Sequence, residues 1–307
     1  MPKFNVEKSI TIAAPQEQVF NTVRDFKQWP KWSPWLNAEP DCTLEYNPDG
    51  KSYSWEGQVI GSGEMEIISE ESPNQITYQL TFLKPWKSTS QVEFRFEPEG
   101  DQTKATWTMA GSLPVFLFWM KKMTVAMIGM DYQRGLAMLK PYIESGSNPS
   151  RLSFTGETTQ AACQYIGITT ESRLEDLGTT TSRDFTKLAN WLKETNTKAT
   201  GAPFSITHRF DMVSQITNFT AGIPIESAPS SPPEGFIVAQ RPATKTFAIQ
   251  HTGPYHHLGN AWAAGMFRAR NKVFTQNKKL DCFEVYENDP GETPANELLT
   301  TVHFPLK

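Results

Sequence analysis

A closely spaced series of extended segments between residues 40 and 111 limits the folds open to this chain more than any other feature. Alternating polar and apolar residues predict strands over about 40–46, 52–60, 63–70, 75–83, 88–97 and 103–111. Turn residues separate them, as in Asn47-Pro48-Asp49-Gly50 and Ser72-Pro73-Asn74. Connections this short join neighbouring antiparallel strands, so the series predicts an antiparallel meander with one face covered.

The segments on either side of the meander supply its cover. A first strand is predicted over 6–12, and a helix follows Ala14-Pro15 and runs to about Arg24. After the meander, a single helical pattern extends from Val115 to Ile143. This pattern carries Met120, Met123, Met127, Met130 and Met138. A methionine stripe of this kind either fills a core or lines a cavity.

Three tryptophans lie close together before the meander. Trp29, Trp32 and Trp35 are interrupted by Pro30 and Pro34, which prevent a long helix here. Two interpretations remain open: a packed aromatic corner, or the lid of a ligand cavity.

The order of these elements, with KSITIAAPQEQVFNTVRDFKQWPKWSPW at the front, resembles the START-like helix-grip superfamily (SRPBCC), which includes polyketide cyclase/dehydrase-type proteins. The resemblance covers residues 1 to about 145. It implies an antiparallel sheet around a long C-terminal helix, with a hydrophobic cavity between them. The motif is specific for the fold rather than for an activity, because members of the superfamily range from lipid binders to cyclases.

A polar, turn-forming break at 146–150 suggests a second domain. We predict a helix-grip domain over 1–145, a linker over 146–157 and a second domain over 158–307. The second domain repeats a strand-helix-strand-strand unit, so both domains are predicted to be α+β. The paired segments are 163–169 with 247–253, 181–194 with 255–277, 204–211 with 283–290, and 219–225 with 300–306. Two such units would form a groove at their junction, where ligands are commonly held.

Glu284 is the most unusual residue of this repeat. Its neighbours favour a half-buried strand, in which a carboxylate costs several kcal/mol unless it is paired or hydrogen-bonded. Glu284 aligns with Ser205 in the other half, so the acid belongs to one half only. Alternation places Cys282, Glu284 and Tyr286 on one strand face. The carboxylate either forms a salt bridge to a lysine or arginine or marks a ligand site.

The second domain resembles the gyrase-inhibitor-like (GyrI-like) effector-binding domain. The residues that carry the resemblance are His251-x-Gly253-Pro254-Tyr255, Leu258, Ala261-Trp262, Phe283-Glu284-x-Tyr286-x-Asn288-Asp289-Pro290 and Thr300-x-Val302-x-x-Pro305. The resemblance implies an aromatic-lined groove for hydrophobic, often aromatic or cationic compounds, with a glutamate at its centre. That glutamate carries over to Glu284, and the aromatic walls to Tyr255, Trp262 and Tyr286. Some stand-alone members of the family resemble hydrolases that act on strained cyclopropane-containing compounds.

Composition excludes several other classes of protein. The net charge of −4, without a long basic run, argues against direct nucleic-acid binding. Cys42, Cys163 and Cys282 are far apart, so neither a disulfide framework nor a cysteine zinc site is predicted. The N-terminus lacks the apolar core of a signal peptide, and the apolar run 113–120 is too short to span a bilayer. We therefore expect a cytoplasmic protein without membrane contact.

The remaining chemical motifs point away from metals and cofactors. His251, His256 and His257 are predicted to be loop or capping histidines rather than metal ligands. No Gly-rich phosphate loop, GxSxG elbow or HExxH motif occurs, and we predict neither a metal nor a cofactor.

Two functions follow from these patterns. The leading hypothesis is a binding protein for a hydrophobic, cationic or aromatic small molecule, of the sensor or sequestering type without its own DNA-binding domain. Its ligand-binding residues would be Glu284, Tyr255, Trp262 and Tyr286. The alternative is a hydrolase of reactive hydrophobic compounds of the cyclopropanoid type, with Glu284 as general base and Tyr255 or Tyr286 orienting water or substrate. An interaction protein with filled cavities is a third possibility, and the sequence leaves the oligomeric state open.

Overall fold

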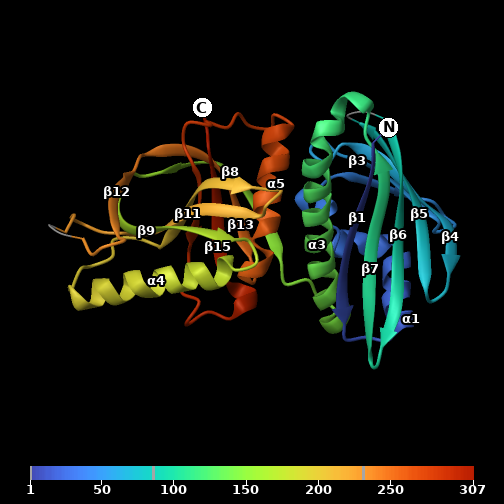
Figure 1. Cartoon of the computed structure of the whole chain (residues 1–307), viewed down its shortest axis with the longest axis horizontal. Coiled ribbons are helices and arrows are strands. Elements are labelled where there is room, and N and C mark those ends of the chain that lie inside the picture. The colour runs from blue at the N-terminus through green and yellow to red at the C-terminus, as the bar shows by residue number, and fades with distance from the viewer. Residues whose placement is uncertain (1, 85–86, 230–231) are drawn as a thin grey trace. The chain divides into compact units, whose positions relative to one another are not determined.

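The computed structural model describes residues 2–84, 87–229 and 232–307, and it divides into two compact units, Met1–Pro149 and Ser150–Lys307 (Figure 1). Each unit combines one antiparallel sheet with helices, which confirms the predicted α+β class. The units are described separately below.

The described residues of the first unit form a seven-stranded sheet in the order β1-β7-β6-β5-β4-β3-β2. From β2 to β7 each strand pairs with the next one in the chain, so the predicted meander is confirmed. The strands are β1 Lys3–Ile12, β2 Thr43–Tyr46, β3 Ser52–Glu56, β4 Ser62–Glu71, β5 Gln75–Lys84, β6 Ser88–Glu99 and β7 Gln102–Ser112.

Helices cover the inner face of this sheet, which carries Val92, Phe94 and Phe96. They are α1 Gln16–Arg24, α2 Pro34–Ala38 and α3 Lys121–Ser145, with a 3₁₀ helix at Phe26–Lys31. The prediction of one helix from Val115 was wrong at its start, because Val115–Met120 is a separate 3₁₀ helix without a buried residue. Most helical stability comes from packing, which this exposed segment lacks.

Aromatic rings fill much of the space between the sheet and α3. Trp29 and Trp32 are completely buried, with ring centroids 4.6 Å apart. Trp107 on β7 stacks on Tyr132 of α3 at 3.9 Å. The tryptophans therefore form a packed aromatic corner, and these rings occupy space in which the resemblance to the START-like superfamily implies a cavity.

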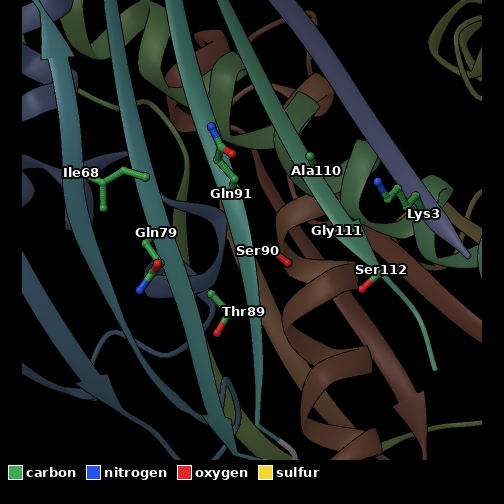
Figure 2. A pocket seen from close by; sticks show the side chains of 9 residues that line it. All are labelled: Lys3, Ile68, Gln79, Thr89, Ser90, Gln91, Ala110, Gly111 and Ser112. Atoms are coloured by element: carbon green, nitrogen blue, oxygen red, sulfur yellow. The ribbon is translucent and has the colours of Figure 1, made fainter. Parts of the chain in front are cut away.

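The first unit has an open depression of about 400 Å³ (Figure 2). Its lining comes from β1 and β4–β7, and the exposed side chains of Gln79 and Gln91 are part of it. Known binding pockets enclose most of the surface of their ligand, whereas this depression is open, so we do not assign a ligand to it.

The described residues of the second unit form an eight-stranded sheet in the order β12-β9-β11-β10-β14-β15-β13-β8. The strands are β8 Arg151–Gln160, β9 Cys163–Arg173, β10 Phe204–Asp211, β11 Ile216–Pro224, β12 Ile237–Arg241, β13 Thr244–Thr252, β14 Cys282–Tyr286 and β15 Leu299–Pro305. The strands β9, β10 and β11 correspond to β13, β14 and β15, as the repeat predicts. β8 and β12 occupy equivalent places at the two edges. If each strand is replaced by its equivalent, the sheet order is the same when it is read from the opposite edge.

Each half also contains an edge strand that was not predicted. β8 precedes β9 in the chain but pairs with β13, and β12 precedes β13 but pairs with β9. The first strand of each half thus pairs with a strand of the other half. The segment 151–157, predicted as part of a linker, is the start of β8.

One helix follows the second strand of each half: α4 Leu177–Glu194 after β9, and α5 Gly259–Arg270 after β13. The predicted helix over 255–277 was too long at both ends. Tyr255–His257 is a 3₁₀ turn, and α5 ends at Arg270, after which Lys272 adopts a left-handed φ of 60°. A helix cannot continue through a left-handed residue.

Candidate functional site

The two halves of the second unit meet where β10 pairs with β14. Ser205 lies directly opposite Glu284, with Phe204 opposite Val285 and Ile206 opposite Phe283. The two positions that the repeat equates therefore face each other at the centre of the sheet. The two halves differ chemically at this position, because one has a glutamate where the other has a serine.

Two neutral donors hold the Glu284 carboxylate. The indole Nε1 of Trp262, on α5, donates to Oε2 at 2.7 Å, and the hydroxyl of Tyr286 donates to Oε1 at 2.6 Å. Burial raises the pKa of Glu284, and the two hydrogen bonds oppose this shift because they stabilise the anion.

The structure argues against the salt-bridge interpretation of Glu284. Among the described residues, no lysine or arginine pairs with its carboxylate or affects its pKa. A carboxylate that has lost water and has only neutral partners attracts a cation. Glu284 has no cationic partner of its own among the described residues, so it could interact with a cation from outside the chain.

Two further aromatic rings pack around Tyr286, which bonds to this carboxylate. Tyr255 packs edge-on against Tyr286 with ring centroids 5.5 Å apart, and Phe185 of α4 packs against the same ring at 5.4 Å. Burial, followed by the Glu284 charge, raises the pKa of Tyr255. The pKa of Tyr286 is also raised by burial and by Glu284, so both phenols remain protonated donors near neutral pH.

The four residues named from the sequence thus come together, since Glu284 bonds to Trp262 and Tyr286, and Tyr286 contacts Tyr255. Phe185 was missed. It belongs to the other half of the repeat, and on an amphipathic helix one apolar residue cannot be distinguished from the core residues around it.

The packing of α5 sets the position of Trp262. The indole ring lies against Phe304 of β15 at 5.6 Å, and Gly265 lies over the same phenylalanine. A Cβ atom at position 265 would overlap the Phe304 ring. Glycine is required here for the helix to approach the sheet closely.

The histidines of this unit form structural contacts. His251 bonds to Ser150 through Nε2 at 3.0 Å, and His303 bonds to Thr246 through Nδ1 at 3.0 Å. His208, which has no obvious partner in the sequence, bonds to Asp281 at 2.7 Å. Among the described residues no cluster of histidine, cysteine or carboxylate side chains is arranged to hold a metal ion.

These buried imidazoles predict a loss of stability in acid. Burial lowers the pKa values of His251, His257 and His303 to about 4, with His256 adding to the first two shifts and Arg241 to the third. The unfolded chain, with pKa values near 6.5, binds more protons between pH 6.5 and 4, so stability is complete above pH 6.5 and falls below it. Each imidazole contributes up to about 3 kcal/mol. The raised pKa of Glu284 acts in the opposite direction above pH 4.5.

Urea unfolding followed between pH 7 and 4.5, with imidazole Cε1–H resonances titrated in parallel, tests this prediction. We expect the stability to decrease steadily and the three resonances to stay at their neutral positions to below pH 5. Titration of these imidazoles near pH 6.5 would contradict it.

The fold and the site define a two-domain protein built from small-molecule-binding domains. Residues 3–144 match the family "Polyketide cyclase / dehydrase and lipid transport", and residues 157–307 match the "GyrI-like small molecule binding domain". The chain is therefore a fusion of a START-like helix-grip domain and a GyrI-like domain, as the sequence motifs indicate.

The following solved structures resemble parts of this chain and are distant from it in sequence. A cryo-EM structure of an EcmrR–DNA complex in EcmrR-RPo is 12% identical, with a TM-score of 0.45 over 61% of this chain and 65% of that chain. The crystal structure of the EcmrR C-terminal domain is 14% identical, with a TM-score of 0.41 over 52% and 98%. CalU16 from Micromonospora echinospora is 17% identical, with a TM-score of 0.33 over 46% and 83%. This chain thus spans slightly less than two thirds of the EcmrR chain in the DNA complex.

No curated protein matches the chain. Among the described residues, no helix has both the length and the apolar character needed to cross a membrane.

Proposed function

We propose that the second unit binds a hydrophobic organic cation, with Glu284 as counter-ion and Tyr255, Trp262 and Tyr286 as aromatic walls. The chain would then act as a sensor or sequestering protein for such compounds. The observation that supports this proposal is a desolvated carboxylate that two neutral donors hold in place and that no described cation neutralises.

The energetics favour a cationic ligand over a neutral one. A cation beside Glu284 supplies the electrostatic partner that this half-buried carboxylate lacks. Each ring that it faces adds about 0.5–2 kcal/mol through cation–π attraction. A neutral compound of the same shape gains only apolar burial.

Hydrolysis is the second candidate, because a raised pKa suits a general base. However, the Trp262 and Tyr286 hydrogen bonds stabilise the carboxylate anion and therefore weaken it as a base. Because the carboxylate is weakened as a base, we rank binding above hydrolysis. The same hydrogen bonds hold both oxygens in fixed positions, which would suit a counter-ion and a catalyst equally.

Charge selectivity provides the test. We expect tetraphenylphosphonium to bind the full chain at least about tenfold more tightly than the neutral triphenylphosphine oxide in titration calorimetry, because a counter-ion contact in a desolvated site is worth 1.4 kcal/mol or more. The preference should shrink as the pH falls and Glu284 becomes protonated, since its pKa is raised. Equal affinity for the two compounds at neutral pH would reject the proposal.

A further inference from the structure

Arg241, at the end of β12, lies over two aromatic rings of the second unit. Its guanidinium carbon is 4.7 Å from the ring centroid of Phe204 on β10 and 4.4 Å from that of Phe283 on β14. Phe283 and Glu284 are consecutive residues of one strand, so their side chains point to opposite faces of the sheet. Arg241 therefore lies on the face opposite to the Glu284 site.

These distances also require the sheet to be strongly curved. β12 is the first strand in the sheet order and β14 the fifth, which would separate them by about 19 Å in a flat sheet with strands about 4.8 Å apart. An arginine side chain cannot span that distance, so the sheet must curl around it. Arg241 thus crosses the concave face.

The concave face is apolar and aromatic around this cation. Tyr165, Phe204, Ile206 and Phe283 form its buried cluster, and Tyr165 packs edge-on against Phe204 at 5.0 Å. Burial, its largest cause, lowers the pKa of Arg241, although the group remains charged. The face therefore combines a hydrophobic wall with one positive charge.

The guanidinium lacks the partners that a buried cation requires. Nε and Nη1 are shielded from solvent and have no hydrogen-bond acceptor among the described residues. Arg241 also forms no salt bridge within the described part of the chain. The two ring contacts offset part of the desolvation, but they satisfy none of the N–H donors, and an unsatisfied charged donor costs more than a neutral one.

We propose that Arg241 binds the carboxylate of a small aromatic acid on this concave face. A carboxylate matches the planar guanidinium fork and would accept two parallel hydrogen bonds. Phe204, Phe283 and Tyr165 are themselves covered, so the aromatic body of such an acid would lie against the partly exposed apolar residues that pack on them, Cys163, Ala239 and Val285. Arg241 as a whole is only partly buried, so its outer edge is accessible to an entering ligand. This site is independent of Glu284 and of the cation proposed to bind there.

Calorimetric titration of the full chain with benzoate tests the proposal, with acetate and inorganic phosphate as comparison ligands. We expect benzoate to bind and Arg241→Gln to weaken its binding by about tenfold or more, because hydrogen bonds to a charged group are stronger than those between neutral groups. Benzoate should bind more tightly than acetate, which lacks the ring, and than phosphate, which is not planar. Arg209→Gln, at an exposed arginine on β10, should leave benzoate affinity unchanged.

A second measurement does not depend on how the variant folds. The Arg241 Nε–Hε resonance of the wild-type chain should shift on adding benzoate, and Arg241→Lys should retain weaker binding because it keeps the charge without the fork. Absence of benzoate binding, unchanged affinity in a folded Arg241→Gln variant, or equal affinity for phosphate and benzoate would each overturn the proposal.

Discussion

Glu284→Gln is expected to lower the affinity for tetraphenylphosphonium by about 30- to 100-fold, which corresponds to roughly 2–3 kcal/mol. Glutamine has nearly the same shape as glutamate but carries no charge, so the aromatic walls remain and the counter-ion is lost. The amide also cannot accept from both Trp262 and Tyr286 through two oxygens, as the carboxylate does. Titration calorimetry on the full chain measures the change.

The matched control is Glu287→Gln, which removes a carboxylate from an exposed residue just beyond β14. Its affinity should equal that of the wild type, and the circular dichroism of both variants should be native. Triphenylphosphine oxide should bind wild type and Glu284→Gln alike. If a folded Glu284→Gln variant retained its full affinity for the cation, Glu284 would not be the counter-ion. Turnover of a strained cyclopropane substrate that this variant loses would instead favour the hydrolase.

Much of the fold could be predicted from the sequence because local patterns determine it. The meander of the first unit follows from short turns, and such turns leave the chain no pairing other than with its neighbour. The repeat in the second unit follows from matched order and spacing. In the meander the information lies within a few residues, whereas the repeat is recognised because two separate parts of the chain carry the same succession of local patterns.

The missed strands depend on contacts between distant segments. β8, with the sequence RLSFTGETTQ, carries serine, threonine and glycine where a strand signal needs larger apolar residues, and β12 has only five residues. Each is stabilised by pairing with the opposite half of the repeat. A pairing partner so far away in the chain leaves no local pattern to recognise.

The residues of the candidate site also fall into two groups, those that the sequence could indicate and those that it could not. Glu284 could be singled out because a charge within an apolar strand is locally anomalous, and Tyr255, Trp262 and Tyr286 accompany it in one recognisable motif. Phe185 and Arg241 could not be found, because neither is unusual among its sequence neighbours. Their significance arises only when the sheet brings α4 to Tyr286, and β12 to Phe283.

Gly265→Ala is expected to destabilise the second unit and to weaken cation binding together. Alanine favours a helix over glycine by about 1 kcal/mol, so an unconstrained position would gain stability. Here the added methyl group overlaps the Phe304 ring, and that ring is completely buried between Trp262 and Phe274. Because the ring cannot move aside, overpacking outweighs helix propensity and we expect a net loss of about 2 kcal/mol.

Hydrogen exchange at the amides of α5 and β15 measures this loss locally, and Met266→Ala, at an exposed neighbouring position on α5, is the control with nearly unchanged protection. The overlap is relieved most easily if α5 moves away from the sheet, and this movement carries the Trp262 indole away from Glu284. Tetraphenylphosphonium affinity should therefore fall in Gly265→Ala but not in Met266→Ala. A Gly265→Ala variant with greater protection in α5 would show that the helix tolerates the methyl group. Loss of protection with full affinity would instead show that the position of Trp262 does not control the site.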